Sequence, residues 1–342
     1  MLRSETAASP ARRMAALAGL QAYQAAPRAR RSELPAATHR QGRAALRDYG
    51  GPGRPVIVVP SLINPPYILD LAPDLSLLRW LAEQGFRTYL LDWGTPDPSE
   101  RTIDATAHVQ SFLLPLIAKM TEPPVLVGYC LGGTLALSAA CVTDVAGLAM
   151  VAAPWRFAGF GDEARRDIAE LWRSARPACE ALGFVPMEVL QAGFWNLDPG
   201  KTIAKYEAFA RMDPRSDAAR LFVAMEDWAN TGAPLPYATG RQLFEDFVAQ
   251  DLTGRGAWQV DGHAIVPEAL RCPAIDFVSR TDRIVPAASA ADLPDRRDLH
   301  AGHVGMVVGR GAKAQLWEPL AHWISALPAA RRRTPSSIGA EP

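Results

Sequence analysis

The chain has 342 residues, 49% of them hydrophobic and 21% charged, which is the balance of a globular protein with one large core or two modest ones. Its 36 basic and 36 acidic residues give a formal net charge of zero, so charge provides no basis for binding nucleic acid or an anionic membrane. No run of about 18 apolar residues occurs, and the four cysteines show no metal or disulfide spacing, so we expect neither a transmembrane helix nor a metal site.

Residues 1–50 are predicted to form an amphipathic helix followed by a polar connector. Apolar side chains recur at helical spacing through Met14, Leu17, Leu20 and Tyr23, which favours a helix lying on the main domain. The arginine-rich composition of this segment also resembles that of an organellar transit peptide. Because a secretory hydrophobic region is absent, we expect a reducing, cytoplasmic setting.

From residue 51 the sequence alternates short apolar runs with helical segments. We expect strands at 56–59, 88–91, 125–127, 148–152 and 274–278, and helices at 75–84, 103–120, 131–141 and 312–327. Pro115 should kink the second of these helices, because proline has no amide hydrogen to donate. This alternation predicts a mostly parallel, doubly wound α/β sheet with helices on both faces.

The alternation stops after residue 154. The next hundred residues contain predicted helices at 164–181, 199–210, 217–230 and 240–249. We interpret 155–262 as a helical cap inserted between strands of a core that comprises residues 51–154 and 263–327. Residues 328–342 are expected to be a disordered tail.

Cys130 stands in the most informative segment of the chain, residues 125–134. An apolar strand leads into a turn in which Gly128 and Gly132 flank the cysteine, and an Ala/Leu-rich helix follows. This is the pattern of the G-x-S-x-G nucleophile elbow, with cysteine in place of serine. Cβ atoms at the two glycines would collide with the neighbouring strand and helix. The alternative is a buried, unreactive cysteine, but the flanking glycines after a strand favour the elbow.

A cysteine nucleophile requires a base and an acid that orients it, in the chain order nucleophile, acid, histidine. Asp282 follows the strand predicted at 274–278, and His303 lies 21 residues later between two nearby glycines. Asp276 is a poorer acid because it alternates within the strand itself, and Asp282 could alternatively serve only to form a turn. The remaining histidines are poorer candidates by position or flanking residues: His39, His108, His263, His300 and His322.

An oxyanion hole is also expected. The backbone amide of Leu131, directly after the nucleophile, would provide one donor. Leu62 or Ile63 would provide the second, since Pro60 in the same loop has no amide hydrogen. The same loop can also be interpreted as a rigid, proline-rich connector.

Beyond the elbow, several further motifs resemble those of the polyhydroxyalkanoate synthases, a polyester-forming branch of the α/β-hydrolase superfamily. The similar segments lie at 63–71, 91–94, 128–134, 225–228, 281–286 and 302–305. The resemblance spans roughly residues 54–327 and is to the short catalytic-subunit type, which works with a second, non-homologous subunit. It implies an α/β-hydrolase fold in which Cys130 carries the growing acyl chain and His303 activates the sulfur. Asp282 would orient His303 or help to activate the incoming hydroxyl group.

The resemblance implies an acyltransferase that polymerises hydroxyacyl-CoA into polyhydroxyalkanoate and releases CoA. The implied partners are the hydroxyacyl-CoA substrate, the polyester chain, a second copy of the chain and a second synthase subunit, with a cytoplasmic location at the surface of polyester granules. Coenzyme A would arrive with the substrate, no other cofactor is expected, and the sequence does not place its binding residues. The alternative is a cysteine-dependent hydrolase, that is, a thioesterase, esterase or polyester depolymerase. A third interpretation is a granule-bound interaction protein that has retained only the fold.

Overall fold

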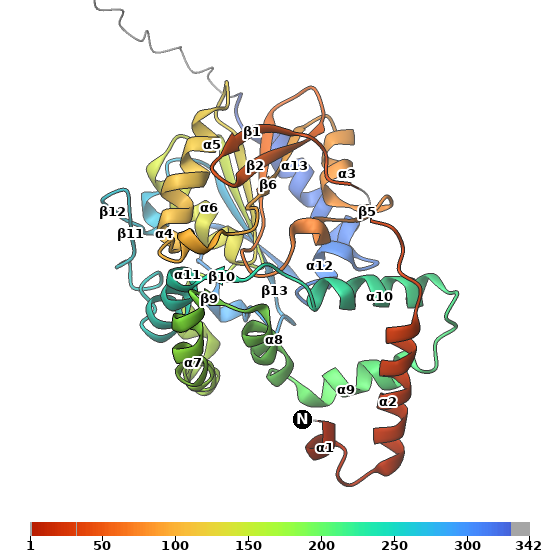
Figure 1. The fold of residues 1–342 in the computed structure, drawn as a ribbon. Helices are drawn as coiled ribbons and strands as arrows, with labels where there is room; N and C mark the ends of the chain where they lie inside the picture. Colours follow the sequence, from red (N-terminus) through yellow and green to blue (C-terminus); the bar gives the residue numbers. More distant parts are fainter. Residues whose placement is uncertain (1, 32, 330–342) are drawn as a thin grey trace, which may run out of the picture.

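The computed structural model describes residues 2–31 and 33–329. The predicted disordered tail lies outside these residues, apart from its first two positions. Within the described chain, helices and strands form a central sheet, helices on both of its faces, and a group of helices at one end (Figure 1). None of the described helices combines the length and the apolar character needed to cross a bilayer.

The central sheet has eight strands in the order β1-β2-β6-β3-β7-β8-β13-β14. Their bounds are β1 Ala37–Gln41, β2 Ala44–Gly50, β3 Pro55–Val59, β6 Arg87–Asp92, β7 Val125–Tyr129, β8 Gly147–Val151, β13 Ala274–Ser279 and β14 Asp295–Leu299. The strands from β6 to β14 pair in parallel, whereas β1 and β2 form an antiparallel hairpin that joins the sheet at β6. The predicted mostly parallel sheet is therefore confirmed.

Two parts of the sheet were not predicted. The segment expected to be a polar connector contains β1 and β2, and the edge strand β14 was missed. Residues Ala44 to Leu46 of β2 are buried, but alanine is a poor indicator of strand. β1 and β14 lie at the two edges, where exposed polar side chains obscure the apolar signal. The sheet therefore begins at residue 37, and the predicted start of the core at residue 51 is too late.

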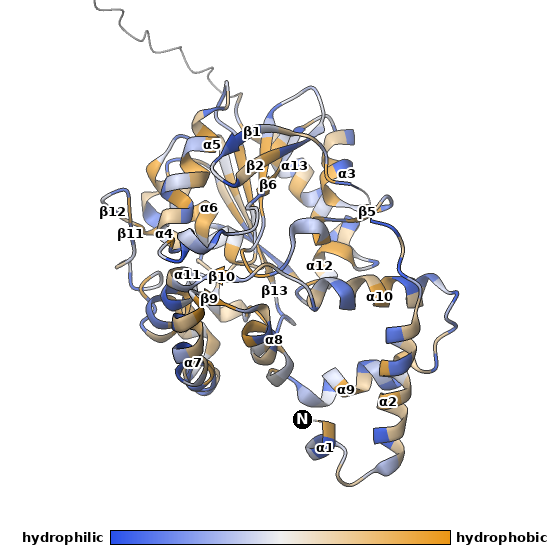
Figure 2. Cartoon of the chain, viewed as in Figure 1, coloured by the Kyte–Doolittle hydropathy of each residue, from blue (hydrophilic) through white to orange (hydrophobic). Residues whose placement is uncertain are grey.

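The inner strands are buried on both faces, as their continuous apolar runs predict. Ile57 and Val59 of β3 pack into one hydrophobic cluster, and Val56 and Val58 pack into the other. The first face is covered by α4 Ala105–His108, η3 Val109–Leu113, α5 Leu114–Ala118 and α6 Leu131–Val142. The second face is covered by α3 Leu77–Glu83, α12 Gly305–Val308, η8 Lys313–Trp317 and α13 Glu318–Ala326. Figure 2 shows the hydrophobic colour concentrated in the central strands and on the inner sides of these helices.

Pro115 does not simply kink its helix. A turn of π-helix, η3, runs directly into α5, and Pro115 is the second residue of α5, so the helix departs from regular α-helical hydrogen bonding just before the proline. The predicted helix at 312–327 shows the same arrangement, with the π-helical η8 leading into α13 and its first-turn proline.

The insertion between β8 and β13 is mainly helical. It contains η4 Phe157–Phe160, α7 Asp162–Leu182, α8 Met187–Asn196, α9 Pro199–Phe209, α10 Asp217–Ala229, α11 Tyr237–Arg241 and η5 Gln242–Ala249. Helix α8 was not predicted, because its apolar residues do not form one stripe. Short elements complete the fold: α1 Leu2–Glu5, β4 Asp70–Ala72, β5 Leu75–Ser76, β9 Phe184–Val185, β10 Leu235–Pro236, β11 Gln259–Val260, β12 His263–Ala264, η1 Pro66–Leu69, η2 Pro98–Glu100, η6 Pro267–Ala269 and η7 Ala287–Ser289.

The predicted N-terminal helix exists as α2 Pro10–Ala25, but it lies on the inserted helices rather than on the main domain (Figure 1). Gly19 allows the backbones of α2 and α9 to approach, since a Cβ atom there would lie 1.9 Å from the carbonyl oxygen of Tyr206. The Tyr23 hydroxyl donates to Asp227 of α10 over 2.6 Å. The predicted apolar stripe is only partly covered, because Met14 remains 66% exposed.

Candidate active site

Cys130 occupies a sharp turn between β7 and α6. Its φ of 55° and ψ of −134° are rare for a residue with a side chain, and its amide nitrogen donates to the carbonyl oxygen of Val151 in β8 over 2.9 Å. No side chain caps the N-terminus of α6, where Leu131 is the first helical residue. The turn therefore presents the sulfur beside free amide groups at the positive end of a helix.

The glycines around Cys130 are sterically required. A Cβ atom at Gly128 would lie 2.3 Å from the Cα atom of Gly133, and one at Gly132 would lie 2.1 Å from the carbonyl oxygen of Val59. Gly133 is equally tight, with its Cβ position 2.3 Å from that of Ala153. The predicted collisions with the helix and the neighbouring strand are confirmed.

Asp282 and His303 lie close together at the carboxyl-terminal ends of the parallel strands. Asp282 is in the loop after β13, and His303 is in the loop after β14. The His303 Nδ1 atom lies 2.6 Å from the Asp282 Oδ2 atom, and the two side chains are only 6% and 1% exposed. The other carboxylate oxygen, Oδ1, accepts hydrogen bonds from the amides of Ile284 and Val285, at 2.8 and 3.0 Å. These bonds hold the carboxylate so that it faces one nitrogen of the imidazole ring.

Cys130 is close enough to influence the ionisation of His303. Burial by itself lowers the pKa of the imidazole, but the negative charges of Cys130 and Asp282 and hydrogen bonds to both outweigh it and raise the pKa above the ordinary 6.5. With Nδ1 directed at Asp282, Nε2 is left for the sulfur. The structure thus brings together the three residues that sequence analysis selected.

Tyr129 is a contact residue that sequence analysis missed. Its ring stacks on the His303 ring with 5.2 Å between centroids, and its hydroxyl donates to the His303 carbonyl oxygen over 3.2 Å. The only sequence signal was its position next to Cys130. Tyr129 therefore fixes both the ring and the backbone of His303.

The glycines beside His303 do not have the role that was expected of them. A Cβ atom at Gly302 would meet no atom within 4 Å, and one at Gly305 would meet only the Ala301 side chain at 3.9 Å. The expectation that they bring the ring against the nucleophile is wrong. The loop position and the contacts to Asp282 and Tyr129 do this instead.

Of the expected oxyanion donors, Ile63 is already engaged. Its amide donates to the Ser61 hydroxyl oxygen over 3.1 Å within the loop after β3. The loop is held by Trp93 Nε1, which donates to the Pro60 carbonyl oxygen over 3.0 Å, and by Trp228 of α10, which donates to that of Pro65 over 2.8 Å. Leu131 and Leu62 remain the candidate donors.

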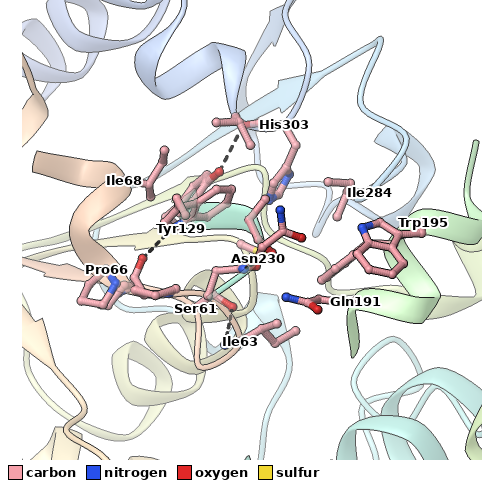
Figure 3. A pocket seen from close by; sticks show the side chains of 18 of the residues that line it. Ser61, Ile63, Pro66, Ile68, Tyr129, Gln191, Trp195, Asn230, Ile284 and His303 are labelled. Carbon is pink, nitrogen blue, oxygen red and sulfur yellow. Dashed lines mark hydrogen bonds between the residues drawn. The ribbon is translucent and has the colours of Figure 1, made fainter. Parts of the chain in front are cut away.

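Two cavities of different character meet at Cys130. The larger, about 210 Å³, also contains His303 and Tyr129 and has polar residues from the insertion, including Gln191, Lys205 and Asn230. Figure 3 shows Gln191 and Trp195 on the side of the cavity opposite Pro66, with Asn230 near His303 and His303 beside Tyr129. The smaller, about 130 Å³, is lined by apolar residues.

Comparison with known proteins agrees with this geometry. Residues 56–314 match the model of a family described as the alpha/beta hydrolase family. The chain belongs to the alpha/beta hydrolase family. Among solved structures it is similar to DcsB in complex with its substrate analogue, with a TM-score of 0.50, 18% identity, and coverage of 82% of this chain and 94% of the other. The α/β-hydrolase fold expected from the sequence is therefore confirmed.

Several curated proteins similar to this chain are named poly(3-hydroxyalkanoate) polymerase subunit PhaC. The chain is 30% identical over 287 residues to the poly(3-hydroxyalkanoate) polymerase subunit PhaC of Haloferax mediterranei, covering 79% of this chain and 58% of that protein. It is 27% identical over 303 residues to the subunit of the same name from Synechocystis sp., covering 79% of this chain and 77% of that protein. The chain thus spans less than two thirds of the length of the Haloferax relative.

Proposed function

We propose that this protein is an acyltransferase that joins hydroxyacyl groups, delivered as CoA thioesters, into a polyester through a thioester on Cys130. The observation that carries the proposal is the grouping of Cys130, His303 and Asp282 at the carboxyl-terminal ends of the parallel strands, in a chain similar to poly(3-hydroxyalkanoate) polymerase subunits. Transfer from one thioester to another is nearly thermoneutral, so the first step needs no cofactor beyond the CoA that the substrate brings.

In the first half-reaction His303 accepts the proton of the Cys130 thiol, and the thiolate attacks the carbonyl carbon of the substrate thioester. Asp282 stabilises the imidazolium ion and keeps the ring oriented. The amide of Leu131 would donate to the oxyanion, with Leu62 as the second candidate donor. His303 then returns the proton to the sulfur of CoA as the carbon–sulfur bond breaks.

In the second half-reaction a hydroxyl group, from a second monomer or from the growing chain, attacks the acyl group on Cys130. His303 removes the hydroxyl proton and delivers it to the Cys130 sulfur, which regenerates the thiol. Water in place of that hydroxyl would give hydrolysis. The burial of His303 and the apolar cavity next to Cys130 support acyl transfer, because both limit access of water to the intermediate.

Purified protein should be incubated with 3-hydroxybutyryl-CoA, and released CoA, soluble 3-hydroxybutyrate and insoluble polyester should be measured together. The proposal predicts that polyester accounts for most of the released CoA. Free acid in equal amount to CoA would contradict it and favour a hydrolase. Because the resemblance implies a second, non-homologous subunit, the assay should be run with and without a candidate partner subunit.

A further inference from the structure

The smaller cavity at Cys130 is lined by apolar side chains, unlike the larger one. We propose that it holds the alkyl part of the acyl group on Cys130, and that Leu171 and Gly193 set the length of alkyl chain that it accepts. This inference rests on the proposed function, since it assigns a substrate group to the same nucleophile. It concerns the size of the acyl group and not the choice between polymerisation and hydrolysis.

The cavity is built to exclude polar groups. Cys130 lies at its edge, and the surrounding side chains come mainly from η4, α7, α8 and η5. The larger cavity on the other side of Cys130 offers amide, hydroxyl and ammonium groups instead. An acyl-CoA has the same two kinds of part, an apolar acyl tail and a polar pantetheine arm, so the tail fits the smaller cavity and the arm the larger.

Aromatic pairs make part of the cavity wall rigid. Phe157 stacks on Phe160 with 5.5 Å between ring centroids, and Phe244 stacks on Trp172 with 4.9 Å. Side chains in such pairs cannot yield without losing the contact. The size of the cavity is therefore determined by the remaining, aliphatic part of the wall.

Leu171 of α7 and Gly193 of α8 face each other in that part of the wall. A Cβ atom at Gly193 would lie 3.3 Å from the Leu171 Cδ2 atom and would meet no other atom within 4 Å. A side chain added at 193 thus enters the cavity region without striking backbone. Removal of the Leu171 side chain enlarges the same space from the opposite helix.

The volume gives the scale of the bound group. An apolar protein cavity of about 150 Å³ accommodates benzene, so about 130 Å³ has room for roughly six carbon atoms or fewer. Burial of each methylene should favour binding by about fourfold until the cavity is full. Longer chains should then lose affinity.

The test uses N-alkyl iodoacetamides with alkyl chains from ethyl to decyl. The alkylation rate of Cys130 is measured by mass spectrometry for the wild type, Leu171→Ala, Gly193→Val and a control, Gly200→Ala, whose Cβ would meet only Asp198 at 3.8 Å, outside both cavities. The inference predicts a rate maximum near six carbons in the wild type. Leu171→Ala should move the maximum to longer chains, Gly193→Val to shorter chains, and Gly200→Ala should leave it unchanged.

The same chain-length profile in all four proteins would overturn the inference, as would a wild-type rate that does not depend on chain length. The two variants act in opposite directions, so failure of one to fold leaves the other decisive. The probes need no turnover, and the proposed function is judged separately by the products formed from 3-hydroxybutyryl-CoA.

Discussion

At the scale of single residues, Cys130 has an unfavourable backbone conformation that its neighbours enforce. A positive φ at a residue with a side chain costs on the order of 1–3 kcal/mol and persists only where the surroundings determine it. Here the Val151 carbonyl oxygen accepts the hydrogen bond of the Cys130 amide, and close-packed glycines surround the turn. As a result of this conformation, the Cys130 sulfur projects toward His303 rather than into the core.

His303→Gln should slow CoA release from 3-hydroxybutyryl-CoA by on the order of 10²–10⁴, because glutamine cannot accept the thiol proton. His300 provides the matched control, since it lies three residues earlier and is exposed. His300→Gln should retain the wild-type rate. Equal losses in the two variants would show that the loop, and not the imidazole of His303, is what matters.

The ionisation of His303 offers a second residue-scale test. Because negative charge on Cys130 and Asp282 raises the pKa of His303 above 6.5, the imidazolium should persist at pH values where an ordinary histidine is neutral. A ¹⁵N NMR titration should find a lower pKa for His303 in Cys130→Ala and in Asp282→Asn than in the wild type. An unchanged pKa in both variants would mean that these residues do not act on the ring.

At the scale of elements, the turn from β7 into α6 has no room for side chains at its glycines. Gly132→Ala places a Cβ atom 2.1 Å from the Val59 carbonyl oxygen, so β3 or α6 has to move. We expect a loss of about 1–3 kcal/mol or more in the free energy of unfolding, measured by chemical denaturation. Gly302→Ala has open space and should change stability by no more than about 0.5 kcal/mol. Comparable losses in both would contradict the steric role assigned to Gly132.

The elements that could be predicted from sequence are those with an uninterrupted physical signal. The strand before Cys130 is apolar throughout because it is buried on both faces, and the glycines of the turn can be recognised directly in the sequence. The strand Asp295–Leu299 has four charged residues in succession on a sheet edge, so nothing in its sequence resembles a buried strand. Helix α8 was not predicted for the opposite reason. It has apolar residues on several sides, because it borders both cavities, and these residues do not form one stripe.

The candidate site shows the same division. Cys130, Asp282 and His303 could be selected because chain order and loop position restrict the choice in a parallel sheet. The contact between Tyr129 and His303 joins residues 174 positions apart, which no local pattern reveals. The engagement of the Ile63 amide by Ser61 likewise depends on the conformation of one loop.

At the scale of the whole molecule, Asp276 connects the stability of the sheet to pH. Burial within β13 raises the pKa of its carboxyl group to about 7, against smaller opposing effects of the Ala291 backbone and Arg296. Between the ordinary value of 3.8 and about 7, the folded protein holds a proton that the unfolded chain has released. Stability from this group therefore falls as pH rises through that range, and the full penalty is present above it.

Asp276→Asn removes this titration. The free energy of unfolding of the variant minus that of the wild type should therefore increase from pH 4 to pH 8, by up to roughly 4 kcal/mol. Denaturant unfolding at both pH values measures this, and other titrating groups cancel in the difference. A difference between the two proteins that does not change with pH would contradict the burial of an unionised Asp276.

The central claim is that Cys130 carries the acyl group during turnover. It is tested most directly by rapid acid quenching of the protein mixed with 3-hydroxybutyryl-CoA, followed by mass spectrometry of the intact protein and its peptides. We predict a hydroxybutyryl adduct on the peptide that contains Cys130, no adduct in Cys130→Ala, and no CoA release by that variant. An acyl adduct on Cys141, Cys179 or Cys272, or undiminished CoA release by Cys130→Ala, would contradict the account.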